Sequence, residues 1–118
     1  MTVRNAVGEF WLWAKGHRRR LRVVGESMVP TLRDGQYVLY ERGAAPRVDD
    51  LVVARHPTQA IDIVKRVIAI DPVGLIELGS DNPSAGTDSR TFGRIDVDEV
   101  LGCVTISLEW PFGEVGRR

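Results

Sequence analysis

The sequence predicts a mainly β protein, built as a small coiled sheet or partial barrel with a short N-terminal helix or arm. Three observations predict this class. Short apolar runs of four to ten residues recur from residue 21 to residue 108, turn residues such as Asp-Gly, His-Pro and Asp-Pro separate them, and almost no segment has helical spacing. A chain of 118 residues with 43% apolar content is long enough for one domain with a modest core.

Residues 1–20 are expected to form an N-terminal arm. An aromatic segment, Phe10–Trp13, precedes the basic run Lys15–Arg20, and residues 1–22 carry a net charge of +5 in a chain whose net charge is zero. Aromatic residues beside a basic cluster are typical of an anchor on an anionic membrane surface. The same spacing fits a short helix whose face of Phe10, Trp13 and Ala14 packs on the domain and which leaves the arginine run in solvent. A peripheral membrane contact through residues 10–20 therefore remains one of two hypotheses.

The β domain is expected to cover residues 21–112, and residues 113–118 are expected to form a flexible tail. A polar loop from Ser80 to Arg90 is long for a small domain, and long ordered loops are often functional. One helical turn is expected at Asp96–Val100, and Trp110–Phe112 are expected to close the domain. The predicted strands are Leu21–Val24, Gln36–Glu41, Leu51–Arg55, Ile61–Ile70, Leu75–Leu78 and Gly102–Leu108.

Composition and charge exclude several function classes. No segment approaches the roughly 20 apolar residues that a membrane-spanning helix needs. A net charge of zero argues against nucleic acid as a partner. Cys103 is the only cysteine, which excludes an intramolecular disulfide and a multi-cysteine metal site. In its strand-like run Cys103 is expected to be a small buried apolar residue.

Ser27 lies on an abrupt bend. It belongs to the segment Gly25–Leu32, which follows an apolar run, contains Pro30 and precedes a turn at Asp34-Gly35. Such a bend presents a hydroxyl group where a nucleophile would be useful. Serine is also favoured as a cap of a turn, so the bend by itself does not distinguish the two roles.

Lys65 lies in the middle of the predicted strand Ile61–Ile70, on a face that is otherwise apolar. Fourteen of the sixteen basic residues are arginine, so a lysine at this desolvated position is notable. Burial lowers the pKa of a lysine by up to roughly 3–5 units, and a neutral amine can act as a general base. Pairing of Lys65 with Asp62 or Asp88 is the structural alternative. A serine nucleophile needs a base beside it, so Ser27 and Lys65 together predict a Ser–Lys dyad.

Three segments resemble, in the same order, the conserved boxes of signal peptidase I-type serine peptidases. Gly25–Leu32 is similar to their nucleophile box, and Val64–Ile68 is similar to their general-base box. Ser80–Pro83 followed by Thr87–Gly93 is similar to their C-terminal Asp-Asn and Asp-Ser-Arg box. The resemblance covers nearly the whole domain but not the arm. It implies the coiled sheet of signal peptidase I and of the C-terminal domain of LexA-type repressors, and a serine endopeptidase without cofactor or metal.

The resemblance also implies residue roles. Ser27 would attack the scissile carbonyl, neutral Lys65 would take its proton, and the Ser27 backbone N–H would stabilise the oxyanion. Many relatives have a hydroxyl side chain two residues before the nucleophile, where this chain has Gly25, so a backbone group or water would take its place. The residues expected to support the site are Met28, Arg66, Asp81, Asn82, Asp88, Ser89 and Arg90.

Gly86 is a second departure from the pattern of the family. Relatives often have a serine at this position, which orients the catalytic lysine, and glycine cannot do so. Ser84, Thr87 and Ser89 are the candidates for its replacement.

Within the family, the short chain, the Asp81-Asn82-Pro83 sequence and the lack of a spanning segment most resemble the maturation proteases of nickel-type superoxide dismutase. This resemblance implies a bacterial, cytoplasmic enzyme that removes an N-terminal extension from the dismutase precursor. The precursor is expected to bind as an extended strand between residues 21–26 and 61–65.

Four alternatives stay open. Signal peptidase-like processing of exported proteins is one, and a self-cleaving regulatory module of the LexA type is another. A Ser-His-Asp triad would have to use His56 or His17, the only histidines, and His56 has no evident orienting acid. The fourth is an inactive interaction domain, against which the intact pair of Ser27 and Lys65 argues.

Overall fold

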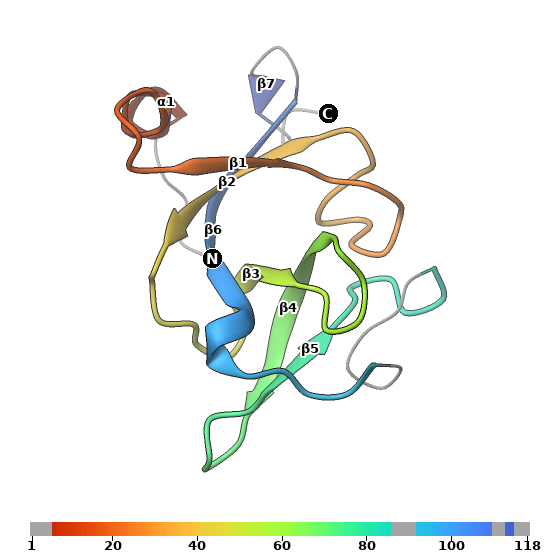
Figure 1. The fold of residues 1–118 in the computed structure, drawn as a ribbon. Helices are drawn as coiled ribbons and strands as arrows, with labels where there is room; N and C mark the ends of the chain where they lie inside the picture. The colour runs from red at the N-terminus through yellow and green to blue at the C-terminus, as the bar shows by residue number, and fades with distance from the viewer. Residues whose placement is uncertain (1–5, 86–91, 110–112, 115–118) are drawn as a thin grey trace.

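The computed structural model describes residues 6–85, 92–109 and 113–114. In these residues the chain forms a short helix, α1 (Ala6–Ala14), a 3-10 turn, η1 (Val97–Glu99), and a seven-stranded sheet (Figure 1). The strands are β1 (Arg19–Arg22), β2 (Tyr37–Arg42), β3 (Leu51–Arg55), β4 (Asp62–Ile70), β5 (Ile76–Gly79), β6 (Val100–Glu109) and β7 (Gly113–Glu114).

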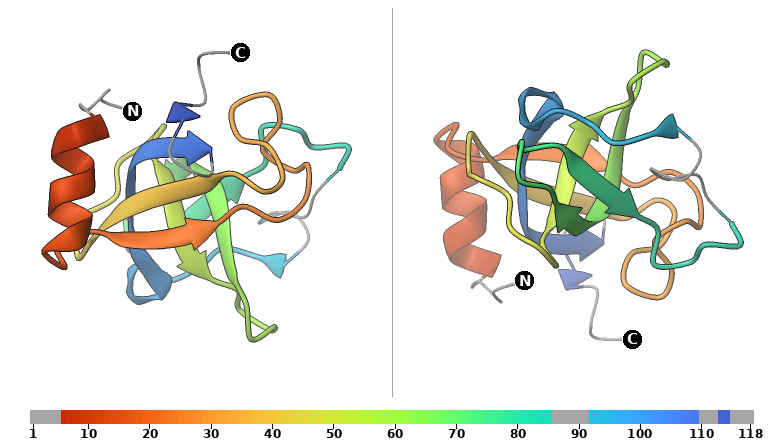
Figure 2. Two further views of the ribbon diagram at one scale, coloured as in Figure 1. Left: turned by 90° about the horizontal axis from the view of Figure 1, so that it is seen from above. Right: turned by 90° about the horizontal axis from the view of Figure 1, so that it is seen from below.

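The sheet is antiparallel throughout and strongly curled. Its strand order is β1-β2-β6-β3-β4-β5, and β7 pairs with β6 outside this path. The register shifts in three strand pairs, β2–β6, β3–β6 and β4–β5, and such bulges bend a sheet and increase its twist. Figure 2 shows the resulting half-barrel, with α1 at one side. The predicted fold class, a mainly β coiled sheet with a short N-terminal helix, is confirmed.

The hydrophobic core explains why the segment between β1 and β2 is held in place. Met28 and Leu32, from this segment, are almost fully buried in a cluster with residues of β2, β3 and β4. Burial of one such side chain stabilises the fold by about 1.5–3 kcal/mol. The segment that carries Ser27 is therefore anchored by its own apolar residues.

The structure shows the short helix expected in the N-terminal arm, and the membrane contact stays a prediction. Trp13 of α1 packs against Leu39 and the β6 residues Ile106 and Leu108. Phe10 and Ala14, which were expected on the packed face, are exposed, and Arg18, which was expected in solvent, is buried against Glu9. The arm is also shorter than expected, because the first strand begins at Arg19 rather than at Leu21.

Other boundaries also differ from the prediction, most of them by one or two residues. The first strand ends at Arg22 instead of Val24, because the chain turns away at Gly25, whose φ is +87°. Gly113 and Glu114 pair with β6, although a flexible tail was predicted from residue 113. The predicted closing segment 110–112 lies outside the described residues. The helical turn at 97–99 is confirmed, with Asp96 as its N-cap. None of the helices in the described ranges has the length and apolar content to cross a membrane.

Candidate active site

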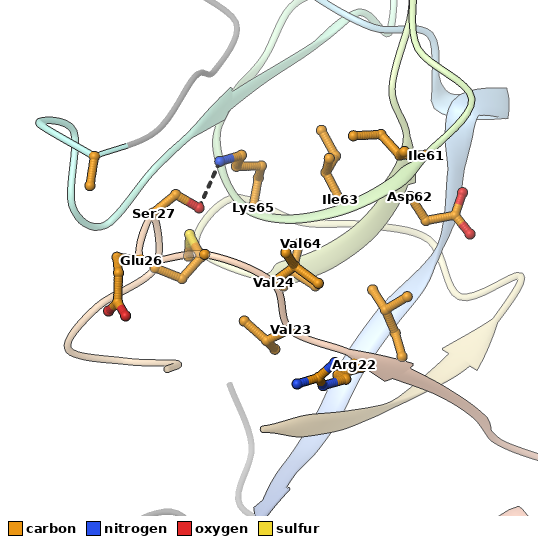
Figure 3. A pocket seen from close by; sticks show the side chains of 14 residues that line it. Arg22, Val23, Val24, Glu26, Ser27, Ile61, Asp62, Ile63, Val64 and Lys65 are labelled. Carbon is orange, nitrogen blue, oxygen red and sulfur yellow. Dashed lines mark hydrogen bonds between the residues drawn. The ribbon is translucent and has the colours of Figure 1, made fainter. Parts of the chain in front are cut away.

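Ser27 lies in a tight turn that is fixed from both sides. Gly25 adopts a φ of +87°, a conformation that glycine tolerates best, and its N–H donates to Oδ1 of Asp34 at 2.7 Å. On the other side Met28 is 1% exposed, and its carbonyl accepts the N–H of Leu32 at 2.8 Å. These contacts hold the Ser27 hydroxyl at the mouth of a groove (Figure 3).

Lys65 extends from β4 toward this turn. Its Nζ lies 3.0 Å from Oγ of Ser27, a residue 38 positions earlier in the chain (Figure 3). Lys65 is 5% exposed, and its neighbour Val64 and the nearby Val23 belong to the apolar core. The burial expected for Lys65 is confirmed. Moving an amine out of water costs free energy unless it is hydrogen-bonded, and the Ser27 hydroxyl is one of the partners of Nζ.

Ser80 also contacts Lys65, although it was not among the site residues predicted from the sequence. Oγ of Ser80 lies 3.0 Å from Nζ of Lys65. None of the three hydroxyl residues predicted to take the place of the family's serine at Gly86 is described in contact with Lys65. Ser84 donates to Oδ1 of Asn82 at 2.8 Å, while Thr87 and Ser89 lie outside the described residues.

The pairing of β4 with β5 explains this contact. Gly79 is the partner of Arg66 in the sheet, so the next residue, Ser80, lies opposite Lys65. Finding Ser80 as a neighbour of Lys65 from the sequence would have required this register, including its shift between Val67 and Ala69.

Arg66 and Asp81 form a two-pronged ion pair beside the site. Arg66 Nε donates to Oδ1 of Asp81 at 2.9 Å and Nη2 donates to Oδ2 at 2.8 Å. Thr31 donates to the same carboxylate, and Arg66 also donates to the carbonyl of Asp49. The hydrogen bond from Arg66 lowers the pKa of Asp81 against the opposing effect of burial, and the same bond raises the pKa of Arg66. The ion pair therefore joins β4 to the turn that carries Ser27.

Asn82 holds the nucleophile turn directly. Its N–H donates to the carbonyl of Ser27 at 2.8 Å, and its Nδ2 donates to the carbonyl of Glu26 at 3.1 Å. The Asp81 N–H contacts the sulfur of Met28 at 3.5 Å. Met28, Arg66, Asp81 and Asn82, four of the supporting residues predicted from the sequence, thus surround the turn. Asp88, Ser89 and Arg90 lie outside the described residues.

A groove of about 360 Å³ runs past Ser27 and Lys65. One wall is formed by residues 21–28 and the other by residues 61–65 (Figure 3). β5 pairs only with Arg66–Ile70 of β4, and β1 is the last strand of the sheet on its side. Among the described residues, Asp62–Lys65 of β4 and Leu21–Arg22 of β1 therefore lie at strand edges, whereas residues 23–28 of the first wall follow β1. A strand edge carries backbone groups that can pair with an extended peptide.

His56 is not arranged as a triad base. Its Nδ1 accepts the N–H groups of Thr58 and Gln59, each at 3.1 Å, and its ring packs on Phe92 with centroids 4.9 Å apart. In a Ser-His-Asp triad the same nitrogen must carry a hydrogen and donate it to the acid. His56 instead stabilises the turn after β3.

Cys103 does not have the properties of a nucleophile either. It is half-buried, and burial, assisted by the carboxylate of Asp50, raises the pKa of its thiol to about 11. A thiol with such a pKa is protonated at neutral pH and is a poor nucleophile.

The sheet, the groove and the hydroxyl–amine pair define a protein of the serine peptidase class. The model of the Peptidase S24-like family matches residues 4–105, and the chain belongs to this family. It is therefore a member of the S24/LexA-type peptidase superfamily, and the prediction of a serine peptidase-type hydrolase is confirmed at this level. The match includes Ser27, Lys65, Ser80 and α1. A comparison with curated proteins gave no match.

Proposed function

We propose that the chain is a serine endopeptidase that uses Ser27 as nucleophile and Lys65 as general base and cleaves a precursor protein supplied in trans. The observation that carries the proposal is the 3.0 Å separation of Oγ and Nζ, with Lys65 only 5% exposed. A serine hydroxyl needs an adjacent base to become nucleophilic, and a desolvated lysine can supply it.

The proposed reaction has two halves. In the first, Ser27 Oγ attacks the scissile carbonyl carbon while its proton moves to the neutral Nζ of Lys65. The lysine then donates this proton to the departing amine, the peptide bond breaks, and an ester forms on Ser27. In the second half, water attacks the ester carbonyl, Lys65 takes a proton from the water, and that proton returns to Oγ as the acid product leaves.

Ser80 and the backbone complete the proposed machinery. Nζ of neutral Lys65 can donate one hydrogen to Ser80 and direct its lone pair toward the Ser27 hydroxyl, so Ser80 positions the amine. The N–H of Gly25 is engaged by Asp34, so it does not serve as an oxyanion donor. We assign the oxyanion to the N–H of Ser27, and loss of one such donor costs other enzymes about 2.7–4 kcal/mol.

The substrate is proposed to bind as an extended strand between residues 21–26 and 61–65. The edge of β4 at Asp62–Lys65 supports this mode, because its backbone groups can pair with a peptide backbone. The Asp81-Asn82-Pro83 segment resembles that of the maturation proteases of nickel-type superoxide dismutase. The precursor of this dismutase is therefore the first candidate substrate, and its N-terminal extension would be the part removed. This assignment also implies a cytoplasmic site of action.

Self-cleavage is the second candidate, and the family match favours it because the S24/LexA-type superfamily includes self-cleaving regulators. The packing of the described residues favours action in trans. β1 is paired with β2, and α1 is fixed to the sheet through Trp13, so neither is placed to enter the groove. The groove lining consists of its two walls and Ala85.

The test compares wild-type protein with Ser27→Ala on two substrates, a synthetic peptide library and the dismutase precursor, with new termini read by mass spectrometry. Cleavage of both by wild type alone supports the full proposal. If wild type cleaves library peptides but not the precursor, the dismutase assignment is wrong and the endopeptidase proposal stands. Appearance of a truncated enzyme, with no cleavage of added substrates, would favour the self-cleaving module. Equal cleavage by Ser27→Ala would contradict the assignment of the nucleophile.

A further inference from the structure

We propose that the exposed face of α1 docks on an anionic lipid surface. This inference does not depend on the peptidase proposal. The face consists of Val7, Phe10, Trp11 and Ala14, all exposed, and the first three have exposed fractions of 66%, 40% and 58%. Their spacing of three and four residues places them along one side of the helix. We call these four residues the α1 stripe.

The other side of α1 explains why the stripe faces outward. Glu9 is 1% exposed, and its carboxylate accepts hydrogen bonds from Arg18, at 3.2 Å, and from Thr105 of β6. Trp13 packs on β2 and β6. A buried, hydrogen-bonded ion pair has a strict geometry, so it fixes the rotation of the helix on the sheet. The aromatic residues of the stripe are thus held in solvent by the contacts of Glu9 and Trp13.

The exposed charges of the segment 6–22 have one sign. Glu9 is the only acidic residue in the segment 6–22, and Arg18 neutralises it inside the fold. Lys15, Arg19 and Arg20 are exposed directly after the helix. On the neighbouring strand β2, the carboxylate of Glu41 lies 3.9 Å from Nη1 of Arg18. The stripe is therefore bordered by cations, as expected for a surface that meets anionic headgroups.

Arg20 adds order to this border. Its guanidinium lies over the rings of Trp13 and Tyr37, with 5.7 Å and 5.1 Å to the two centroids. Such cation–π contacts hold an arginine side chain at low conformational cost. Trp13 in turn contacts Phe10 of the stripe, with ring centroids 5.8 Å apart, so Arg20 is linked to the stripe through Trp13.

A lipid surface fits this patch better than a second protein molecule does. A nine-residue helix is about 14 Å long. One side of such a helix is small beside the roughly 800 Å² that each partner contributes to a stable protein interface. Insertion of a few aromatic side chains at a headgroup boundary, assisted by basic residues, needs no such area.

The α1 stripe and the groove are separate surfaces. α1 and the turn that carries Ser27 lie at opposite ends of β1 (Figures 1 and 2). Docking through α1 would therefore hold the protein at a membrane with its groove open. Substitutions in the stripe should leave cleavage of a soluble peptide unchanged.

The test is co-sedimentation of the full chain with vesicles of phosphatidylcholine alone and of phosphatidylcholine mixed equally with phosphatidylglycerol. We expect binding to the mixed vesicles, with affinity that falls as salt rises. Trp11→Ser should weaken binding about tenfold, since it removes one large apolar side chain from the interface. Arg19→Gln should weaken it about fivefold, because one basic residue near an anionic surface contributes about 1 kcal/mol.

Matched controls test the location of the surface. Val7→Ser should weaken vesicle binding, whereas Val73→Ser, which removes a valine 81% exposed in the turn between β4 and β5, should not. Arg33→Gln is the matched control for Arg19→Gln. No binding to mixed vesicles, equal binding to both vesicle types, or equal loss in Val7→Ser and Val73→Ser would each overturn the proposal. Concentration-dependent dimerisation that Trp11→Ser abolishes would assign the stripe to a second copy of the chain instead.

Discussion

Replacement of Ser80 by alanine tests whether its hydroxyl positions the catalytic lysine. The substitution removes one hydrogen bond of 3.0 Å to Nζ of Lys65 and leaves the 3.0 Å contact between Lys65 and Ser27 in place. A neutral hydrogen bond of this kind contributes about 0.5–1.5 kcal/mol, which corresponds to a rate change of about 2-fold to about 13-fold. Ser80 is not among the residues that line the groove. We therefore expect Ser80→Ala to lower kcat by this factor with KM unchanged.

The assay is steady-state cleavage of a peptide selected from the library, with urea unfolding of each variant to show that it is folded. Ser84→Ala is the matched control, because it removes a hydroxyl from the same loop that bonds Asn82 rather than Lys65. Ser80→Thr keeps a hydroxyl group and should recover part of the lost rate. An unchanged kcat in Ser80→Ala, or an equal loss in Ser84→Ala, would refute the positioning role.

Three further predictions concern the general base, the Arg66–Asp81 ion pair and the close approach of two strands. Lys65→Met should reduce the rate of cleavage by at least about 10²-fold, because it removes the base. It should leave the free energy of unfolding in urea unchanged or higher, because an apolar side chain replaces a buried amine. A marked loss of stability would contradict the expected effect on unfolding. Asp81→Asn should lower the free energy of unfolding at pH 7 by about 1–2 kcal/mol, because the partly exposed pair with Arg66 is weakened. Folding lowers the pKa of Asp81 from its ordinary value of 3.8. The difference in unfolding free energy between wild type and Asp81→Asn should therefore be complete above pH 4 and disappear as the pH falls through the folded-state pKa. A difference that grows in acid would refute the pairing of Asp81 with Arg66. Gly102→Ala would place a Cβ against a backbone carbonyl of β2, so it should destabilise the fold by about 1–3 kcal/mol in thermal unfolding. Gly8→Ala, with open space around its Cβ, should instead stabilise α1 by up to about 1 kcal/mol. Similar effects of the two substitutions would contradict the close approach of β6 to β2.

The proximity of Ser27 and Lys65 could be predicted from the sequence, because each residue violates a local expectation. A lysine on an apolar strand face needs a reason to be buried, and a serine on a bend needs a base to be a nucleophile. The strand that carries Lys65 was placed almost correctly, as β4 begins one residue later than predicted. The alternation of residues in the strand of Lys65 and the bend motif of Ser27 were therefore sufficient to predict this pair.

The contact of Ser80 could not be predicted from such local patterns, because it depends on the pairing of two strands. Asp71 fixes the turn between β4 and β5, since its Oδ1 accepts the N–H groups of Val73 and Leu75. A bulge between Val67 and Ala69 then shifts the register. One residue of shift would move Ser80 away from Lys65.

The two faces of α1 depend in the same way on contacts that are distant in the sequence. Helical spacing did not reveal that Glu9 faces the sheet, because an acidic residue is normally expected in solvent. Arg18 and Thr105 make its burial favourable, and Thr105 is 96 residues away. The polar partners of a buried charge therefore set the orientation of this helix.

The most direct test of the central claim is the rate at which Lys65→Ala and His56→Ala cleave a peptide that the wild-type protein cleaves. His56 is engaged with the backbone of its own turn, whereas Lys65 lies 3.0 Å from the proposed nucleophile. The account predicts no detectable cleavage by Lys65→Ala and a nearly wild-type rate for folded His56→Ala. Cleavage by Lys65→Ala together with its loss in folded His56→Ala would contradict the assignment of Lys65 as the general base.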